Sequence, residues 1–315
     1  MELEQIIENY FLKRPFKEAY FKYLGADNKI FKERIIKTVS NQLKNPEGLL
    51  YFPADHSVIF YAQPNHFRSG ILQVPFYNVP TSLSLEPGSF IRHWPSIQKK
   101  LRPGIYEVQK DFLLSGEWQE YIRAGGFSPG TAIKMVLRKN DVYPTQVLPD
   151  GLIIRPFNEE DGPAVRHIIN EYQGNYLFQS PFLDKSRVTE LFQEWPLYAR
   201  DHLEGRLYVC SLNDNIIGIL NCLPAGNFSH IIGKELGIVD FIMVKKEVQG
   251  KGYAHYLLQY AVEKIFPEAE FIELQTSLEN FAAINFYICH KFKILESRVI
   301  IHMNISSEEG ARSKW

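Results

Sequence analysis

The sequence predicts an α/β protein of two related halves, with a mixed, mostly antiparallel sheet flanked by helices. Three observations predict this class: β-rich runs alternate with helical stretches after residue 48, two strand–helix–strand segments resemble each other, and a linker separates them. The linker "YPTQVLPDG" (Tyr143–Gly151) contains two prolines and an Asp-Gly turn. We therefore predict an N-terminal domain at 1–145 with a helical start, a second domain at 150–305 and a polar tail at 306–315.

The evidence for duplication lies in two pairs of segments. "IYEVQKD" (Ile105–Asp111) resembles "FIELQTS" (Phe271–Ser277), and an aromatic-rich, helix-like stretch follows each. Next come "AGGFSPGTAIKMVLRKN" (124–140) and "CHKFKILESRVIIHMN" (289–304), each a tight turn ending in Phe and then an alternating strand. Two such units can look alike by chance, but the order and spacing agree, and we interpret them as related halves.

The second half is predicted element by element. "LIIRPFNEEDGPAVRHIINEYQ" is typical of a strand followed by a helix, and 206–224 of a hairpin that turns around Asn213–Asn215. Between them, Glu171–Gly205 is long, aromatic and mixed in charge, and we expect a loop. "IVDFIMV" (Ile238–Val244) is strongly β-forming. From Ala254 onward the apolar residues recur at helical spacing.

Composition excludes several classes of protein. The formal net charge of −1 argues against nucleic acid or an anionic membrane as a partner. No apolar run approaches the roughly 20 residues that span a bilayer, and "MELEQIIENYF" lacks the features of a signal peptide. The three cysteines have no metal-ligand spacing, so neither a metal nor a disulfide framework is expected. We expect a cytoplasmic protein that is a monomer or a homodimer.

The turn "QGKG" (Gln249–Gly252) lies between the predicted strand and the predicted helix. Backbone N–H groups at a helix start have no partner within the helix, and together with the helix dipole they attract anions. Glycines at 250 and 252 let a ligand approach the backbone closely. A Rossmann turn would need glycine where His255 stands, and a P-loop would need Ser or Thr at Gly252. A glycine turn without any ligand remains the alternative.

The stretch "QGKGYA" (Gln249–Ala254) resembles the Gln/Arg-x-x-Gly-x-Gly/Ala signature of the GNAT superfamily of N-acetyltransferases. Downstream, "SLENFAAINFYICHKF" (Ser277–Phe292) is similar to the second signature of that family, Asn-x-x-Ala-Ile-x-Phe-Tyr. The resemblance covers 150–304 and implies that acetyl-CoA binds here. It implies cofactor contacts at Ile242, Met243, Val244, Gln249, Gly250, Lys251, Gly252, Tyr253, Ala254, Asn280, Ala283 and Phe286.

The same resemblance implies that Tyr287 is the acid that protonates the departing thiolate. A positioned proton donor of this kind accelerates a reaction roughly 10²–10⁴-fold. The alternative for Tyr287 is a core aromatic residue on an amphipathic helix. One departure from the family pattern is Lys291, which stands where the family has a helix-ending glycine, and there Lys carries a modest backbone strain.

Two residues are candidates for the general base. Asp240 lies on the predicted strand, where many members of the family carry a catalytic Glu, and it shares a strand face with Ile242 and Val244. An acidic residue in such an apolar strand is unusual, although pairing with a buried group would also explain it. The second candidate is His230, in the connection that often borders the acceptor site in this family; a purely structural role is its alternative.

The first half has no such turn, and Ile122 stands at the place of Tyr287 when the halves are aligned on Phe127 and Phe292. We therefore expect a degenerate GNAT-like half and a complete acyl-CoA site only in the second. This arrangement faintly resembles enzymes of the dTDP-fucosamine acetyltransferase type. The sequence predicts acetyl transfer to the primary amine of a small molecule. Protein or peptide N-acetylation and a non-catalytic acyl-CoA sensor are the alternatives.

Overall fold

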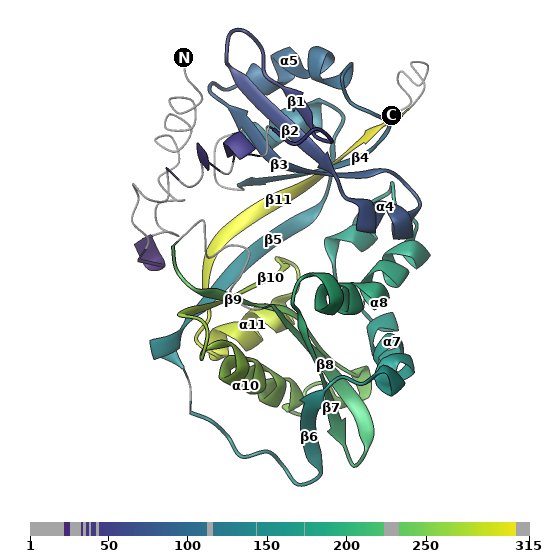
Figure 1. The fold of residues 1–315 in the computed structure, drawn as a ribbon, viewed down its shortest axis with the longest axis vertical. Coiled ribbons are helices and arrows are strands. Elements are labelled where there is room, and N and C mark those ends of the chain that lie inside the picture. The colour runs from purple at the N-terminus through teal and green to yellow at the C-terminus, as the bar shows by residue number, and fades with distance from the viewer. Residues whose placement is uncertain are drawn as a thin grey trace. The chain divides into compact units, whose positions relative to one another are not determined.

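The computed structural model describes residues 22–25, 33, 36–37, 39–41, 44–111, 116–142, 144–172, 174–223 and 233–306. Most of the expected helical start, nearly all of the polar tail and the candidate base His230 lie outside these residues. Within them, helices alternate with the strands of a mostly antiparallel sheet, as predicted (Figure 1). No helix in the described ranges has both the length and the apolar character needed to cross a bilayer.

The chain divides into two compact units. As far as their residues are described, unit 1 holds Met1–Ala132, Tyr176–Arg187 and Glu296–Trp315, and unit 2 holds Ile133–Asn175 and Val188–Leu295. The units differ from the two halves of the sequence because the strands β5 (Phe127–Arg138) and β11 (Lys293–Ile305) each contribute residues to both.

Unit 1 is a sheet with helices packed against it. Its strand order is β1-β2-β3-β4-β11 and then the first part of β5; β3 and β4 are parallel. The Phe90 ring of its helix α5 stacks on the Tyr121 ring of α6 in the core. The elements are β1 (Leu49–Tyr51), β2 (Val58–Pro64), α4 (His66–Leu72), β3 (Phe76–Ser84), α5 (Ser89–Gln98), β4 (Gly104–Asp111), α6 (Glu117–Arg123) and the 3-10 turn η3 (Tyr176–Gln179).

Unit 2 repeats this arrangement. Its strand order is β6-β7-β8-β9-β10 and then the second part of β5; β9 and β10 are parallel. The elements are η1 (Lys139–Asp141), β6 (Leu152–Pro156), η2 (Glu159–Asp161), α7 (Gly162–Asn170), α8 (Lys185–His202, in this unit from Val188), β7 (Arg206–Leu212), β8 (Asn215–Leu223), β9 (Leu236–Val244), η4 (Lys246–Val248), α10 (Tyr253–Ile265), β10 (Phe271–Ser277) and α11 (Phe281–Cys289).

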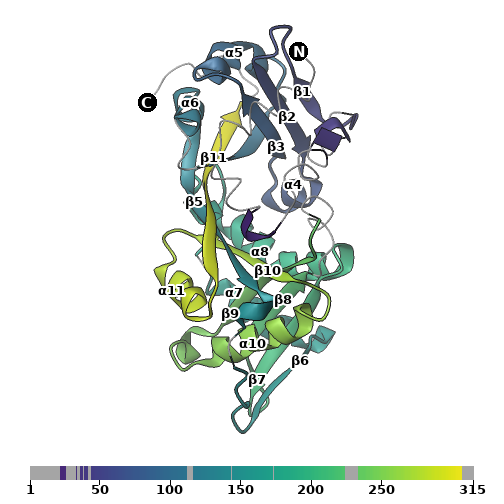
Figure 2. The ribbon, with the colours of Figure 1, turned by 90° about the vertical axis from the view of Figure 1, so that its left-hand side faces the viewer.

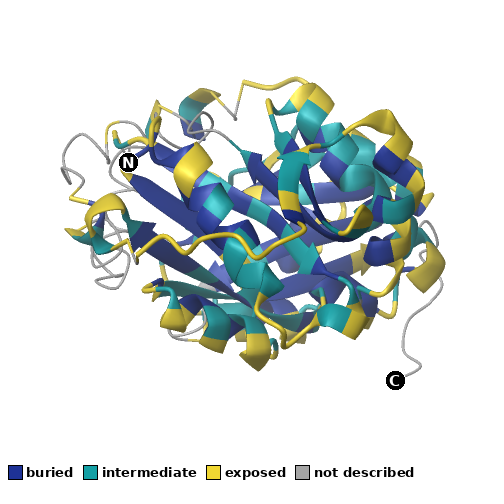
Figure 3. Ribbon diagram, turned by 90° about the horizontal axis from the view of Figure 1, so that it is seen from below, coloured by how far each residue is buried: buried dark blue, intermediate teal, exposed yellow. Residues whose placement is uncertain are grey.

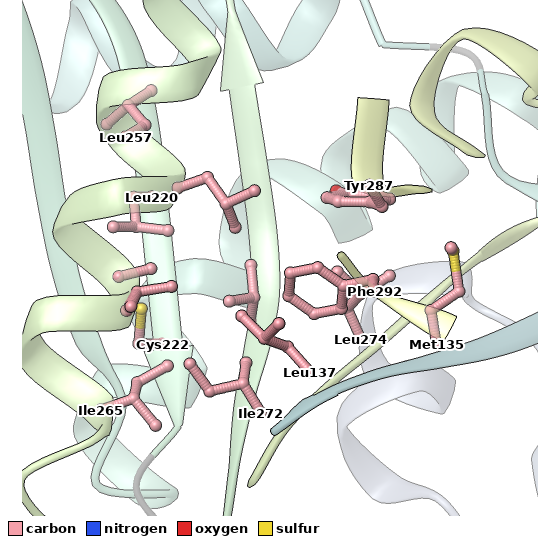
Figure 4. Close-up of a cluster of buried hydrophobic side chains, with 14 of the residues drawn as sticks. Met135, Leu137, Leu220, Cys222, Leu257, Ile265, Ile272, Leu274, Tyr287 and Phe292 are labelled. Atoms are coloured by element: carbon pink, nitrogen blue, oxygen red, sulfur yellow. The ribbon is translucent and has the colours of Figure 1, made fainter. Parts of the chain in front are cut away.

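Helices cover both faces of the unit 2 sheet. The alternation of side chains along β8 sends Leu220 and Cys222 to the face of α10, and Ile219 to the face of α7. The larger cluster, on the α10 face, also contains Tyr287 and Phe292 (Figure 4). The strands are mostly buried, and exposed residues gather on the outer sides of helices and in loops (Figure 3). The sheet is therefore a rigid support for groups at its edges.

The structure confirms the predicted hairpin and corrects the predicted loop. Asn213 and Asp214, both with positive φ (46° and 65°), form the two-residue turn between β7 and β8. The expectation of a loop over Glu171–Gly205 is wrong for Lys185–His202, which forms the helix α8. Its buried residues Val188, Leu191 and Ala199 follow a helical period that Pro196, inside the helix, obscures in the sequence.

The last strand of each half of the sequence completes the sheet of the other half. In unit 1, β11 from the end of the chain pairs antiparallel with β4, with Ile305 opposite Gly104 and Arg298 opposite Asp111. In unit 2, β5 from the first half lies next to β10, and the Lys134 Nζ contacts the Glu273 Oε1 at 2.8 Å. This exchange explains why the compact units differ from the sequence halves.

Buried polar groups fix β11 beside β4. The Glu107 carboxylate of β4 accepts from Arg68 Nη1 at 2.9 Å and from the Tyr176 hydroxyl at 3.1 Å. His302 of β11 lies 3.5 Å from it and contacts the Ser180 hydroxyl at 2.8 Å. Burial alone would raise the pKa of Glu107, but the Arg68 guanidinium and His302 hold that pKa well below its usual range. The carboxylate is therefore ionised and fully engaged in the packing of unit 1.

Candidate functional site

The strands β9 and β10 separate at the middle of β9. Their parallel pairing joins Phe271–Leu274 to Leu236–Val239 and stops there, while β9 continues to Val244. On its other side, β9 remains paired with β8 up to Val244. Among the described residues, the backbone of 240–244 thus has one edge without a strand partner, and an extended polar chain can bind along such an edge.

Asp240 is the extra residue of a β-bulge. Asn221 of β8 is opposite Phe241 and the next residue, Cys222, is opposite Val239, so Asp240 has no partner in the register. A bulge of this kind redirects a side chain and bends the strand. The bulge lies directly after Val239, where the pairing of β9 with β10 ends. The same local irregularity therefore accounts for the separation of the strands and for the direction of the Asp240 side chain.

The glycine turn lies at the end of β9 and starts α10, as predicted. Gly250 and Gly252 have positive φ (75° and 87°), and a Cβ added to either would meet nothing within 4 Å. Within the described part of the chain, the N–H groups of Gly250, Gly252, Tyr253 and Ala254 form no backbone hydrogen bond. The Gln249 amide donates to the Val244 carbonyl at 3.1 Å and ties the turn to the strand. The turn thus offers free donors to an anion.

The helix α11 brings the second predicted signature beside the first. Asn280 is the N-cap of this helix, because its Oδ1 accepts from the Ala283 N–H at 3.2 Å. The cap uses the carbonyl oxygen and leaves the amide nitrogen as a donor for a ligand. Tyr287 is 7% exposed, and its hydroxyl forms no hydrogen bond to any described residue. Burial, with a smaller contribution from Tyr172, raises the pKa of Tyr287, so the hydroxyl stays protonated.

Half of the predicted cofactor-contact residues belong to one hydrophobic cluster, on the α10 face, or pack against it. Val244 and Tyr287 belong to this cluster, and Ile242, Tyr253, Ala254, Ala283 and Phe286 are partly buried against it. Met243 differs, because it packs on the opposite face with the residues under α7. Gln249, Gly250, Lys251 and Gly252 are exposed. The candidate site therefore combines an apolar wall, a free strand edge and a turn with free N–H donors.

The comparisons with known proteins bear directly on this combination. Residues 164–292 match the Acetyltransferase (GNAT) family. They form a GNAT acetyltransferase domain. The matched segment runs from α7 to the turn after α11 and contains the strand opening, the glycine turn and Tyr287. A search of curated proteins found no match.

Solved structures share the fold of this GNAT domain and of the preceding half. A GCN5-related N-acetyltransferase from Sphaerobacter thermophilus is 15% identical, with 87% of this chain and 86% of that chain covered and a TM-score of 0.57. A tandem GNAT protein from the clavulanic acid biosynthesis pathway is 12% identical, with 88% and 89% covered and a TM-score of 0.51. These similarities confirm the predicted fold of tandem GNAT-like halves. The resemblance to dTDP-fucosamine acetyltransferases stays a prediction.

Asp240 of the GNAT domain is held through one of its two oxygens. Trp195 Nε1 of α8 donates to Asp240 Oδ2 at 2.7 Å, and Asn221 Nδ2 donates to the same oxygen at 2.9 Å. Oδ1 has no hydrogen-bond partner among the described residues. Burial raises the pKa of Asp240, and the bonds from Trp195 and Asn221 oppose that rise in part. A carboxylate of raised pKa with one free oxygen is suited to accept a proton.

Sequence reasoning missed two residues of this site. Trp195 lies in the stretch expected to be a loop, and only its helical spacing could have placed it near β9. Asn221 is an amide inside the apolar run "IIGILNCL", and this contrast is the signal that was overlooked. Asn221 is fully buried, and its Oδ1 has no partner in the described structure. Next to Asp240 there is therefore a second acceptor that lacks a donor.

The described residues contain no cluster of three or more metal-ligating side chains. Cys210 and Cys222 are buried, and burial raises the pKa of both thiols, to about 12 for Cys210. Thiols of this kind are poor nucleophiles. Cys289 is exposed and lies two residues after Tyr287 on α11. Residues two apart on a helix point to different faces, and Tyr287 is buried while Cys289 is exposed.

Lys291 has the backbone conformation that its position in the GNAT signature predicts. Its φ is +67°, a left-handed conformation that costs a non-glycine residue about 1 kcal/mol. Lys291→Gly is therefore expected to raise the free energy of unfolding by about 1 kcal/mol, measured by denaturant titration. The control is Lys293→Gly in the extended strand β11, which should lower it. A loss of stability in Lys291→Gly would contradict the strain.

Proposed function

We propose that this protein is an acetyl-CoA-dependent N-acetyltransferase that acts on the primary amine of a small molecule by direct transfer in a ternary complex. The observation that carries the proposal is the opening between β9 and β10 with the free donors of the Gly250–Gly252 turn at its end. The free edge at 240–244 suits the amide-containing pantetheine arm, with Ile242, Met243 and Val244 along it. The turn suits the pyrophosphate, with the Lys251 ammonium beside it.

In the proposed mechanism, Asp240 and Tyr287 move the two protons of the reaction. Bound acetyl-CoA supplies the acetyl group as a thioester. Asp240 Oδ1 accepts, directly or through water, the proton that the amine loses as its nitrogen bonds to the acetyl carbon. Tyr287 donates its hydroxyl proton to the sulfur as the carbon–sulfur bond breaks. To complete the cycle, Asp240 releases its proton to solvent and Tyr287 regains one from solvent. Trp195 and Asn221 hold the other carboxylate oxygen and so fix the direction of Oδ1.

The free acceptor on Asp240 supports an amine as the second substrate. Asp240 Oδ1 lacks a donor within the described residues, and a primary amine brings an N–H donor that can satisfy it. Asp240 is only partly exposed and is hydrogen-bonded to the large Trp195 side chain, which favours a narrow substrate. An amino sugar, including a nucleotide-linked one, fits this description. A peptide panel acetylated in preference to amino sugars would overturn the choice of a small molecule.

The test of the proposed function is the thermal shift with acetyl-CoA. At about 100 times its Kd, a ligand adds roughly 2.7 kcal/mol to the stability of the folded state, a readily visible rise in Tm. Gly252→Asp is expected to abolish this rise, because a carboxylate would stand where the pyrophosphate binds. Gly125→Asp is the matched control: Gly125 also has a positive φ (91°) and open space around it, but it lies in unit 1.

The outcomes separate the enzyme from its alternatives. No shift with millimolar acetyl-CoA in a folded wild type would overturn the proposal. An equal loss of the shift in Gly125→Asp would mean that backbone strain, and not the ligand site, is the cause. A shift without CoA release on any amine would favour the acyl-CoA sensor.

A further inference from the structure

The unit 1 helix α5 begins in the same way as α10, the helix of the proposed acyl-CoA site. Each follows a strand and leads to a second strand parallel to the first, β3 and β4 in unit 1, β9 and β10 in unit 2. Each begins after a glycine with almost the same backbone: φ 84° and ψ −6° at Gly88, φ 87° and ψ −4° at Gly252. A Cβ added to either glycine would meet nothing within 4 Å. The two turns are structural counterparts, although only the second carries the family signature.

The N-terminus of α5 holds a carboxylate of the same chain. The Gly88 N–H donates to Glu120 Oε1 at 2.7 Å, and the Ile91 N–H donates to Glu120 Oε2 at 3.1 Å. Glu120 comes from α6, which packs beside α5 (Figure 2). Its side chain therefore reaches the helix start through the fold and not as a local cap.

The environment of Glu120 is that of an anion in a binding site. Glu120 is 5% exposed, and no Lys, Arg or His of the described structure forms an ion pair with it. A buried carboxylate without a cation is costly unless other groups compensate its charge. The two N–H groups and the dipole of α5 supply that compensation here. At the same helix start, the fully buried Ser89 hydroxyl has no partner among the described residues.

The counterpart position in unit 2 carries no such group. Glu120 lies five residues before Gly125, the positive-φ residue that ends α6, and the residue five before Lys291, which ends α11 with the same hydrogen bonds, is Phe286, an uncharged side chain. The N–H groups at the start of α10 have no protein acceptor in the described structure. One helix start is thus closed by the protein, and the other is open to a ligand.

We infer that the N-terminus of α5 is a phosphate-type anion site whose place is taken by the Glu120 carboxylate. The inference stands on unit 1 alone and does not depend on the proposed function. It has a consequence for that function. Of the two counterpart turns, only the one before α10 is open, so we expect one acyl-CoA per chain. In unit 1 the Glu120 carboxylate takes the place of a ligand, so this unit is stabilised without one.

The test is to remove the carboxylate and offer inorganic phosphate in its place. Both Glu120→Ala and Glu120→Gln are expected to lower Tm by about 5 °C in chloride buffer, because two charge-assisted hydrogen bonds are lost. Phosphate at matched ionic strength should restore at least half of the loss in Glu120→Ala, where the site is vacated. It should restore little in Glu120→Gln, where the amide still fills the space. All variants carry Gly252→Asp, so that phosphate bound at α10 does not contribute.

The control for the loss of one negative charge is Glu160→Ala. Glu160 is exposed, so this variant should keep the Tm of the parent in both buffers. The inference is overturned if Glu120→Ala keeps the parental Tm, or if phosphate raises its Tm no more than that of the parent. If Glu120→Ala does not fold, amide hydrogen exchange in Glu120→Gln decides: faster exchange at Gly88 and Ile91 supports the inference, and unchanged exchange overturns it.

Calorimetric titration of the wild type gives an independent measure. One acetyl-CoA per chain is expected, and two per chain would show that unit 1 is open. No binding at all would end the proposed function, but the phosphate experiment would still decide the role of Glu120.

Discussion

Replacing Tyr287 by Phe is expected to slow acetyl transfer by about 10²–10⁴-fold while acetyl-CoA binding is retained. The substitution removes only the hydroxyl, which makes no hydrogen bond to described residues, so the packing of the aromatic ring in the core is preserved. Steady-state release of CoA measures the rate, and the thermal shift with acetyl-CoA measures binding. A loss in kcat without a loss of binding identifies a proton donor.

The matched control for this prediction is Tyr260→Phe on α10, where the ring packs against Tyr208 away from the strand opening. It should keep wild-type activity. The raised pKa of Tyr287 adds a pH criterion: the group stays protonated well above neutral pH, so activity should not fall through tyrosine ionisation below about pH 10. Activity of Tyr287→Phe within twofold of the wild type would show that solvent protonates the sulfur.

Asp240→Asn is expected to reduce kcat/KM by about 10²–10⁴-fold without loss of stability. The pKa of Asp240 is raised in the folded protein, so the stability linked to its protonation is present below the unfolded pKa and is lost as pH rises through the folded pKa. At pH 7–8 the wild type therefore carries a desolvated charge that Asn lacks. The variant should match or exceed the wild-type Tm there, and the difference should shrink below about pH 4.

The result of Asp240→Asn decides between two candidate bases. Low activity with an undiminished Tm assigns proton acceptance to Asp240 and separates it from a structural role. Full activity would remove Asp240 from the mechanism, and His230, which lies outside the described residues, would be the base to test next by His230→Gln. A lower Tm at pH 8 would mean that the bonds from Trp195 and Asn221 stabilise the ionised carboxylate more than burial destabilises it.

The geometry of the candidate site was predictable where it depends on residues that are close in the sequence. A strand, a turn with two glycines and a helix are encoded within 238–265, and their backbone conformations followed from residue type. The conformation of Lys291 was also predictable, because a missing glycine at a helix end implies a strained φ. The contacts of Asp240 were not predictable in this way, since Trp195 and Asn221 reach it from α8 and β8.

The prediction of the fold was limited in the same way. The two β-α-β segments were visible as a repeat, and each is present, as β4-α6-β5 and β10-α11-β11. The strands that pair with these segments could not be predicted. The alternation of apolar residues along a strand indicates which face is buried, but not which strand lies beside it. The exchange of β5 and β11 therefore appears only in three dimensions. The hydrogen bond between Gly88 and Glu120 was hidden for the same reason, since 32 residues separate them.

The position of β11 has a consequence for how the chain is made. Gln109 and Arg298 are hydrogen-bonded although 189 residues separate them, and β4 finds its antiparallel neighbour only when the last strand is available. During synthesis, the edge of β4 stays open while the whole second half emerges from the ribosome, and an open strand edge is prone to aggregation. A nascent chain stalled before β11 would thus be a target for chaperones, and neither half of the gene is expected to yield a well-folded product alone.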